Sequence, residues 1–193
     1  MQKIDISELL NIAEYEEVRA RQRSEIMAHK AQRRVQLGPH ISMTFEDHKT
    51  IKFQIHEMMR AERMVNDENI QAEIDVYNTL IPKAGELSAT LFIEITQAED
   101  IKAKLHEFIG LTDGNNIWLE VGDLQAYAQF EEGRSEDDKI SSVHYIRFPV
   151  SAELNQALAA GEEPVRFGIE HGKYHYSAEL SAPTRASLMA DLA

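Results

Sequence analysis

The first candidate for chemistry is the stretch IHEMMRAER, residues 55–63, because it comes close to the helical motif by which zinc proteases bind their metal. That motif needs a second histidine one helical turn after the first, so that both imidazoles leave one face and reach the same ion. At that position after His56 stands Arg60, whose guanidinium stays protonated and offers no lone pair to zinc. Helical periodicity also places His56 away from the apolar arc of this helix, which consists of Ile51, Ile55, Met58, Ala61 and Val65. The sequence therefore predicts a solvated surface histidine and no zinc-protease site.

Three glutamates are stronger candidates, because helical periodicity points them toward apolar neighbours. Glu57 and Glu62 belong to a helix expected over residues 49–65. Glu73 belongs to the next helix, expected over residues 67–80. A buried carboxylate without a partner costs several kcal/mol, roughly, so we expect each of the three to be paired, protonated or bound to a ligand.

Catalysis at these two central helices would use the glutamates and two arginines close to them. Glu57 or Glu62 would act as acid, base or metal ligand. Arg60 and Arg63 would bind an anionic ligand, because guanidinium groups form strong hydrogen bonds with carboxylate and phosphate oxygens. The competing interpretation is structural, with the glutamates closed in ion pairs by arginines nearby in the sequence. Those arginines are Arg19, Arg23, Arg33, Arg60 and Arg63.

A metal site is a further hypothesis, because a histidine lies on the apolar face of the first long helix. That helix is expected over about residues 13–34, and His29 projects from the face that carries Ile26. If the helices pack together, His29, Glu62 and Glu73 would converge as metal ligands. Helical metal sites of this kind normally carry Glu-x-x-His pairs, and residues 1–80 contain none.

The elements that position these residues are helices in the first part of the chain and mainly strands in the second. Tight turns flanked by β-prone runs predict three hairpins, at Gly38-Pro39, Gly122-Asp123 and His171-Gly172. Two further strands are expected, over residues 88–95 and 142–150. Three further helices are expected, over residues 97–109, 151–160 and 183–192.

This order of elements predicts an α+β fold, with an antiparallel sheet and the N-terminal helices packed on it. No stretch rich in Pro, Gly or Ser divides the chain. We therefore expect a single domain over residues 1–193, helix-rich in 1–110 and strand-rich in 111–193.

Composition excludes several classes of function. The chain has 193 residues, a formal net charge of −13 and no cysteine. The negative charge argues against nucleic-acid binding. Without cysteine there can be no disulfide and no cysteine-ligated iron–sulfur cluster, while the identity of any other cofactor stays open. We find neither a signal peptide nor an apolar run of about 18 residues, and so expect a cytoplasmic protein that does not enter membranes.

Four blocks of sequence, in order along the chain, carry a resemblance to a known family. They are GPHISMTFED, IKFQIHEMMRAER, YNTLIPKAGELSATLFIEI and GRSEDDKISSVHYIRF. Through them the chain resembles, over nearly its whole length, the bacterial family numbered 3501 in the domain-of-unknown-function series. The family has no established activity, so the resemblance assigns no catalytic residue.

The resemblance does imply partners. Members of this family are often encoded beside a rubrerythrin and an iron–sulfur oxidoreductase-like protein, which implies a role near peroxide defence or electron transfer. Because this chain has no cysteine, it would bring no cluster and no thiol to such a system. Other chains would carry the electrons.

Two functions follow from these observations, and the sequence leaves both open. We expect a non-catalytic accessory protein of a rubrerythrin- and iron–sulfur-linked redox system, which predicts an exposed apolar or charged docking patch. The alternative is a small enzyme or sensor, which predicts a concave pocket at the central helices with a carboxylate that no protein cation pairs. The oligomeric state is open in either case.

Overall fold

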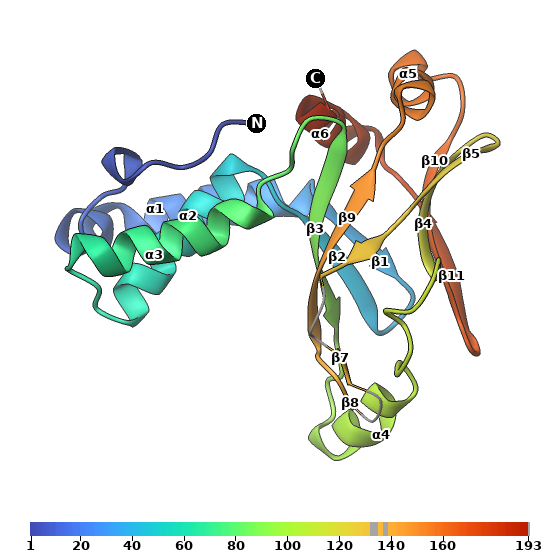
Figure 1. Cartoon of the computed structure of the whole chain (residues 1–193), viewed down its shortest axis with the longest axis horizontal. Helices are drawn as coiled ribbons and strands as arrows, with labels where there is room; N and C mark the ends of the chain where they lie inside the picture. Colours follow the sequence, from blue (N-terminus) through green and yellow to red (C-terminus); the bar gives the residue numbers. More distant parts are fainter. Residues whose placement is uncertain (132–134, 137–138, 193) are drawn as a thin grey trace.

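Three N-terminal helices form a bundle that projects from one side of a β-sandwich (Figure 1). They are α1 (Ile12–Ala31), α2 (His48–Ala61) and α3 (Asp67–Tyr77). Asn11 and Asp47 cap α1 and α2, since each side chain accepts a hydrogen bond from the third residue of its helix. The cap of α3 is Asn66, one residue before the Asp67 that its sequence suggests.

The bundle has an apolar core of its own, which an N-terminal strap, residues 1–11, helps to close. The strap carries the short 3₁₀ helix η1 (Ile6–Glu8). Its Ile4 is buried, and its backbone is held on both sides by Asn78, whose amide accepts from Ile4 N–H and donates to Ile4 C=O. The core consists of Ile4, Ile51, Ile55, Met59, Ile70, Ile74, Tyr77, Leu80 and Ile81.

The computed structural model describes residues 1–131, 135–136 and 139–192. Its strands form two larger antiparallel sheets and a two-stranded ribbon. The five-stranded sheet has the order β1 (Arg34–Leu37), β2 (Ile41–Phe45), β3 (Glu86–Ile93), β9 (Val143–Pro149) and β6 (Gln129–Phe130). The four-stranded sheet has the order β11 (Tyr174–Glu179), β10 (Val165–His171), β4 (Ile117–Val121) and β5 (Leu124–Tyr127). The ribbon pairs β7 (Ser135–Glu136) with β8 (Lys139–Ile140).

The main core fills the space between the two sheets. Phe45 and Phe148 reach it from the five-stranded sheet and meet Phe167 of β10, with ring centroids 5.0 and 5.1 Å from that of Phe167. Helices α5 (Ala152–Ala160) and α6 (Ala182–Leu192) cover one end, and α4 (Ile101–His106), preceded by η3 (Ala98–Asp100), lies at the other (Figure 1). A last 3₁₀ turn, η2 (Asn78–Leu80), links α3 to β3.

The two sheets are joined along both edges. At one edge the chain passes from β5 to β6 through Ala128, so the run QAYAQF, which reads as one strand, serves both sheets. At the other edge the Tyr174 hydroxyl donates to the Leu37 carbonyl and accepts from the backbone N–H groups of His40 and Ile41. The predicted α+β class, antiparallel pairing and three hairpins are confirmed, with two facing sheets in place of one.

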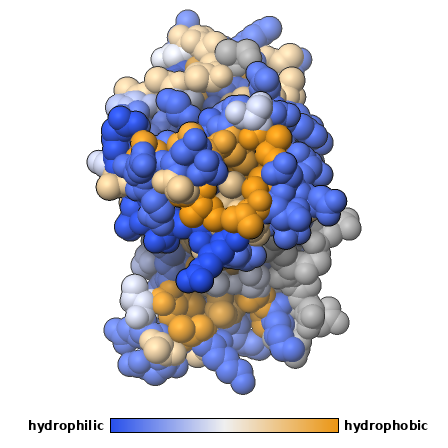
Figure 2. All heavy atoms as spheres, turned by 90° about the vertical axis from the view of Figure 1, so that its left-hand side faces the viewer, coloured by the Kyte–Doolittle hydropathy of each residue, from blue (hydrophilic) through white to orange (hydrophobic). Residues whose placement is uncertain are grey.

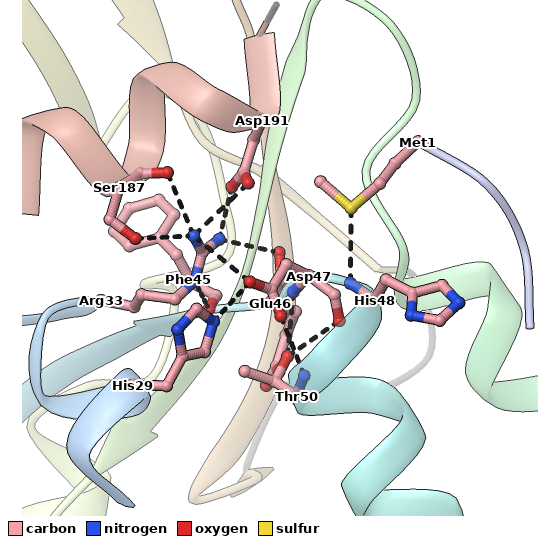
Figure 3. A network of polar contacts seen from close by, with 10 residues as sticks. All are labelled: Met1, His29, Arg33, Phe45, Glu46, Asp47, His48, Thr50, Ser187 and Asp191. Atoms are coloured by element: carbon pink, nitrogen blue, oxygen red, sulfur yellow. Dashed lines mark hydrogen bonds and ion pairs between the residues drawn. The ribbon is translucent and has the colours of Figure 1, made fainter. Parts of the chain in front are cut away.

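A buried arginine fixes the bundle to the sandwich (Figure 3). The Arg33 guanidinium, 1% exposed, donates to the carbonyls of Phe45 and Glu46 and to Ser187 of α6. It also forms an ion pair with Asp191 of α6. All three nitrogens of the guanidinium therefore make contacts, and these contacts hold the end of α1, the end of β2 and α6 together.

Asp47 extends this network to the helices. One carboxylate oxygen caps α2 by accepting from Thr50 N–H, and the other lies 2.6 Å from His29 Nε2 and 3.5 Å from Arg33. Burial would raise the pKa of Asp47, but Arg33, Thr50 and His29 together lower it. Burial raises the pKa of Asp191 in spite of its bond to Arg33.

Within the described part of the chain, none of the helices combines the length and the apolar character that crossing a membrane requires.

Candidate functional site

The free tip of the helical bundle is the candidate site, because several residues predicted from the sequence meet there beside an open hollow. The hollow has a volume of about 830 Å³ and lies where the start of α1 meets the end of α2. An adjoining hollow of about 390 Å³ lies along the start of α3 and shares Arg63 and Val65 with the first. Apolar side chains that line the two hollows are Ile12, Ala13, Ala61, Met64, Val65 and Ala72.

The backbone at the tip adopts a helix-ending motif with an unusual residue in it. Helix α2 ends at Ala61, and the backbone N–H of Met64 bonds to the carbonyl of Met59. In such an ending the residue after the cap is left-handed and is usually glycine. Here it is Arg63, at φ 54°, and among the described residues no other non-glycine has a positive φ. A residue that carries a side chain pays about 1–2 kcal/mol to adopt the left-handed backbone conformation, which marks this position as a candidate for function.

The tip is also where the chain exposes its most accessible large apolar side chain. Val65 is 82% exposed, although the helical pattern of the sequence predicts it on the apolar face of α2. Figure 2 faces this end of the molecule and shows apolar residues gathered around a hollow and bordered by hydrophilic ones. Because contact between such an apolar patch and water is unfavourable, the tip has the character of a docking surface.

The charges at the tip differ in their state of pairing. Arg60 lines the larger hollow and forms an ion pair with Glu16 of α1. Arg63 lines both hollows, is exposed and forms no ion pair with a residue that the structure describes. The structure thus brings the two predicted ligand-binding arginines to one surface, where Arg63 is free to bind a carboxylate.

Glu57 does not belong to this surface. Arg19 donates to both of its carboxylate oxygens at 2.7 Å, and the Tyr15 hydroxyl donates to one of them at 2.7 Å. The hydrogen bonds from Arg19 lower the pKa of Glu57 to about 2, with Tyr15 adding to them against the effect of burial. This closed, ionised arrangement supports the ion-pair interpretation of Glu57 rather than a role in proton transfer.

The residues predicted to share a metal ion lie in two different places. Glu62 is exposed because α2 ends one residue before it, which corrects its placement within an apolar arc. Glu73 is half-buried, and burial, followed by the nearby charge of Glu62, raises its pKa. His29 lies instead with Asp47, at the end of the bundle that meets the sandwich. The predicted convergence is therefore absent, and in the described residues no other trio of His, Asp and Glu side chains is placed to hold a metal ion.

The prediction that His56 is a surface residue is wrong. Its ring is 2% exposed, stacks on Tyr15 at a centroid distance of 4.6 Å, and accepts a hydrogen bond from Leu10 N–H at Nε2. The helical pattern of α2 alone could not show this, because the face that carries His56 is covered by α1 and by the N-terminal strap. Burial and the charge of Lys52 lower the pKa of His56 to about 4.

Sequence reasoning named Arg33 only as one of several possible ion-pair partners. Its carboxylate partner, Asp191, lies 158 residues further along the chain, so no spacing within a motif could have connected the two. The one signal in the sequence is an arginine next to a strand that is otherwise apolar on one face.

The known proteins that resemble this chain are themselves of unknown function. No curated protein matches the chain. Among solved structures, a novel protein of unknown function from Burkholderia pseudomallei K96243 is 34% identical, is covered over 100% of both chains and superposes with a TM-score of 0.91. The family described as protein of unknown function (DUF3501) matches residues 3–192. Nearly the whole chain is thereby accounted for by one family, and the protein is a member of DUF3501.

Proposed function

We propose that this protein is a non-catalytic accessory protein that docks a partner protein on the tip of its helical bundle. The observation that carries the proposal is Val65, 82% exposed beside a hollow with an apolar lining. Many protein interfaces have an apolar centre surrounded by a polar rim, and an exposed valine beside an apolar hollow fits the centre of such an interface.

The chemistry of the tip describes the partner's contact. An apolar side chain of the partner would fill the hollow over Ile12 and Ala61. A carboxylate beside it would pair with Arg63, whose guanidinium has no acidic partner among the described residues. The strained backbone of Arg63 supports this contact, because glycine would be the more stable residue at that position and would carry no charge.

We further propose that the partner belongs to a cytoplasmic redox system, a rubrerythrin or an iron–sulfur oxidoreductase-like protein. The family resemblance supports this identification, since members of the family are often encoded beside both. The composition is compatible with it, because a chain without cysteine leaves iron–sulfur clusters to other proteins.

The test is to mix the purified chain with the rubrerythrin and with the iron–sulfur protein of the same genome, and to measure binding by titration calorimetry. We expect one of them to form a complex that Val65→Asp weakens at least about tenfold, because a charge would enter an apolar contact. Arg63→Gly should weaken it as well, while raising the free energy of unfolding by about 1 kcal/mol through relief of backbone strain.

The chain offers a matched control in a second exposed valine. Val76 lies on α3, is 62% exposed and does not line either hollow, so Val76→Asp should leave the complex unchanged. If neither the rubrerythrin nor the iron–sulfur protein forms a complex with the chain, the redox partnership is refuted. Equal effects of Val65→Asp and Val76→Asp would show that the tip is not the docking surface.

A further inference from the structure

A groove between α1 and α2 has features of a ligand site that the docking proposal does not use. Its volume is about 250 Å³, which is enough for a small molecule. Both helices contribute to its walls. Residues that give it its chemical character are Ile26 and His29 of α1, and Lys49, Lys52, Phe53 and His56 of α2.

The groove is locally basic in a protein whose net charge is −13. Lys49 is exposed at its edge and forms no ion pair with the residues that the structure describes. Lys52 lies 4.0 Å from Glu8 and so is only loosely paired. Glu25 also lines the groove, but its carboxylate lies 3.8 Å from Arg21. Positive charge therefore prevails, and an anion would be attracted.

One histidine is held in place at the edge of the groove. His29 Nε2 lies 2.6 Å from Asp47, whose other oxygen is fixed by Thr50 at the start of α2 (Figure 3). A ring nitrogen tied to a carboxylate fixes the orientation of the whole imidazole, as it does in metal and catalytic sites. The Nδ1 atom of His29 has no partner among the described residues, which leaves it for a ligand.

A second histidine presents an unused donor. Because Nε2 of His56 accepts a hydrogen bond from Leu10 N–H, the proton of the neutral ring resides on Nδ1. This Nδ1–H is buried and has no acceptor within the described structure. A buried donor left unpaired costs about 1–3 kcal/mol, and native proteins normally satisfy it with a protein group, a water or a ligand.

We propose that this groove binds a small organic anion, a carboxylate or phosphate that carries a short apolar part. Lys49 and Lys52 hold the anionic group, and His56 Nδ1–H donates to one of its oxygens. The apolar part packs on Ile26 and Phe53, both of which line the groove. His29 closes the site at the end that meets the sandwich.

The experiment is a titration of the isotope-labelled protein with benzoate, phenyl phosphate and inorganic phosphate, followed by NMR of the imidazole nitrogens. We expect saturable shifts at His29 and His56 with a common dissociation constant for at least one of the aromatic anions. The tighter of benzoate and phenyl phosphate identifies the preferred anionic group. Lys49→Glu should weaken binding about tenfold or more, because it replaces a charged hydrogen-bond donor by a repelling group.

Lys30→Glu is the matched control, since it makes the same change of charge next to His29 but outside the lining of the groove. It should change the dissociation constant by no more than about twofold. Equal weakening by both variants would reduce the effect to general attraction and refute the site. Shifts that do not saturate, or that miss His56, would refute it too. Val65→Asp should leave anion binding intact, so failure of the docking proposal and failure of this one are distinguishable.

Discussion

A histidine that is buried and neutral makes the folded state sensitive to acid. His56 is 2% exposed, and burial lowers its pKa from 6.5 to about 4. Between these two values the unfolded chain binds a proton at this residue and the native protein does not. The free energy of unfolding must therefore fall as the pH drops through this window.

We predict that His56→Gln removes most of this acid sensitivity. A shift from 6.5 to about 4 corresponds to a loss on the order of 3 kcal/mol below pH 4, and to about 2 kcal/mol between pH 7 and pH 5. Glutamine keeps an acceptor for Leu10 N–H but does not titrate. Urea unfolding at pH 7 and pH 5 should show a drop in the original protein that is smaller by about 2 kcal/mol in the variant.

His175→Gln serves as the reference, because its side chain is 55% exposed and lies on the surface of β11. It should retain the full acid sensitivity of the original protein. A drop of the same size in His56→Gln would mean that other groups cause the acid sensitivity and that His56 is not held neutral.

At this scale the sequence could tell which residues deserved attention but not their surroundings. It singled out Glu57 as an inward carboxylate, and the structure places that group between Tyr15 and Arg19. It placed His56 in solvent because helical periodicity describes one helix, whereas burial depends on every element that packs against it. The correct prediction for Glu57 and the wrong one for His56 therefore differ in the surroundings of the side chain and not in its type.

Among the elements, those with strong local signals were predictable. Glycines at Gly38, Gly122 and Gly172 have positive φ and mark hairpins that the sequence predicts. The end of α2 was not predictable, because the left-handed position that terminates it carries Arg63 instead of glycine. The expected helix consequently runs to residue 65, past its observed end at Ala61. The wrong placements predicted for Glu62 and Val65 both result from the absence of a glycine at this position.

The four-stranded sheet depends on a glycine for a different reason. Gly168 of β10 lies opposite Trp118 of β4, and the indole covers the place where a side chain would begin. A Cβ added to Gly168 would lie 2.4 Å from two ring carbons of Trp118, much closer than carbon atoms approach one another.

We predict that Gly168→Ala lowers the free energy of unfolding by about 1–3 kcal/mol, the usual result of overpacking. The fluorescence maximum of Trp118, the one tryptophan of the chain, should shift as the ring is displaced. Chemical unfolding followed by this fluorescence measures both effects.

A neighbouring position on the same sheet provides the comparison. Ser177 pairs with Gly168 in the register of β10 and β11 and is exposed, so Ser177→Ala should change stability by less than about 0.5 kcal/mol. If Gly168→Ala is equally harmless, the indole must be able to move aside without cost.

At the scale of the whole molecule, the buried side chain of Arg33 helps to connect the bundle and the sandwich. Arg33 binds the end of β2 and α6, and Asp47 carries the contact on to α1 and α2. Removing the arginine would leave Asp191 as a buried acid without its cation. This destabilises a protein more than replacing both members of the pair by apolar residues.

We predict that Arg33→Met destabilises the protein by about 3–5 kcal/mol. The double variant Arg33→Met/Asp191→Leu should recover part of this loss, because no unpaired acid remains at Asp191. Unfolding should be followed by Trp118 fluorescence in the sandwich and by circular dichroism of the helices. The two signals should coincide in the original protein and separate in Arg33→Met.

Arg34 is the natural comparison, since it is the next residue and pairs with Glu94 at the surface. Its side chain is 46% exposed, and Arg34→Met should cost less than about 1 kcal/mol. Coincident transitions in Arg33→Met, with a loss no larger than that of Arg34→Met, would show that the contacts of Arg33 are not needed to hold the two parts together.

The order of elements along the chain has a consequence for inheritance. The β1–β2 hairpin belongs to the sandwich, yet it is encoded between α1 and α2 of the bundle. A gene fragment that carried the bundle alone would bring this hairpin with it, with Leu37, Met43 and Phe45 stripped of their partners. A single crossover therefore cannot transfer the whole bundle without the hairpin, nor the whole sandwich without α2 and α3.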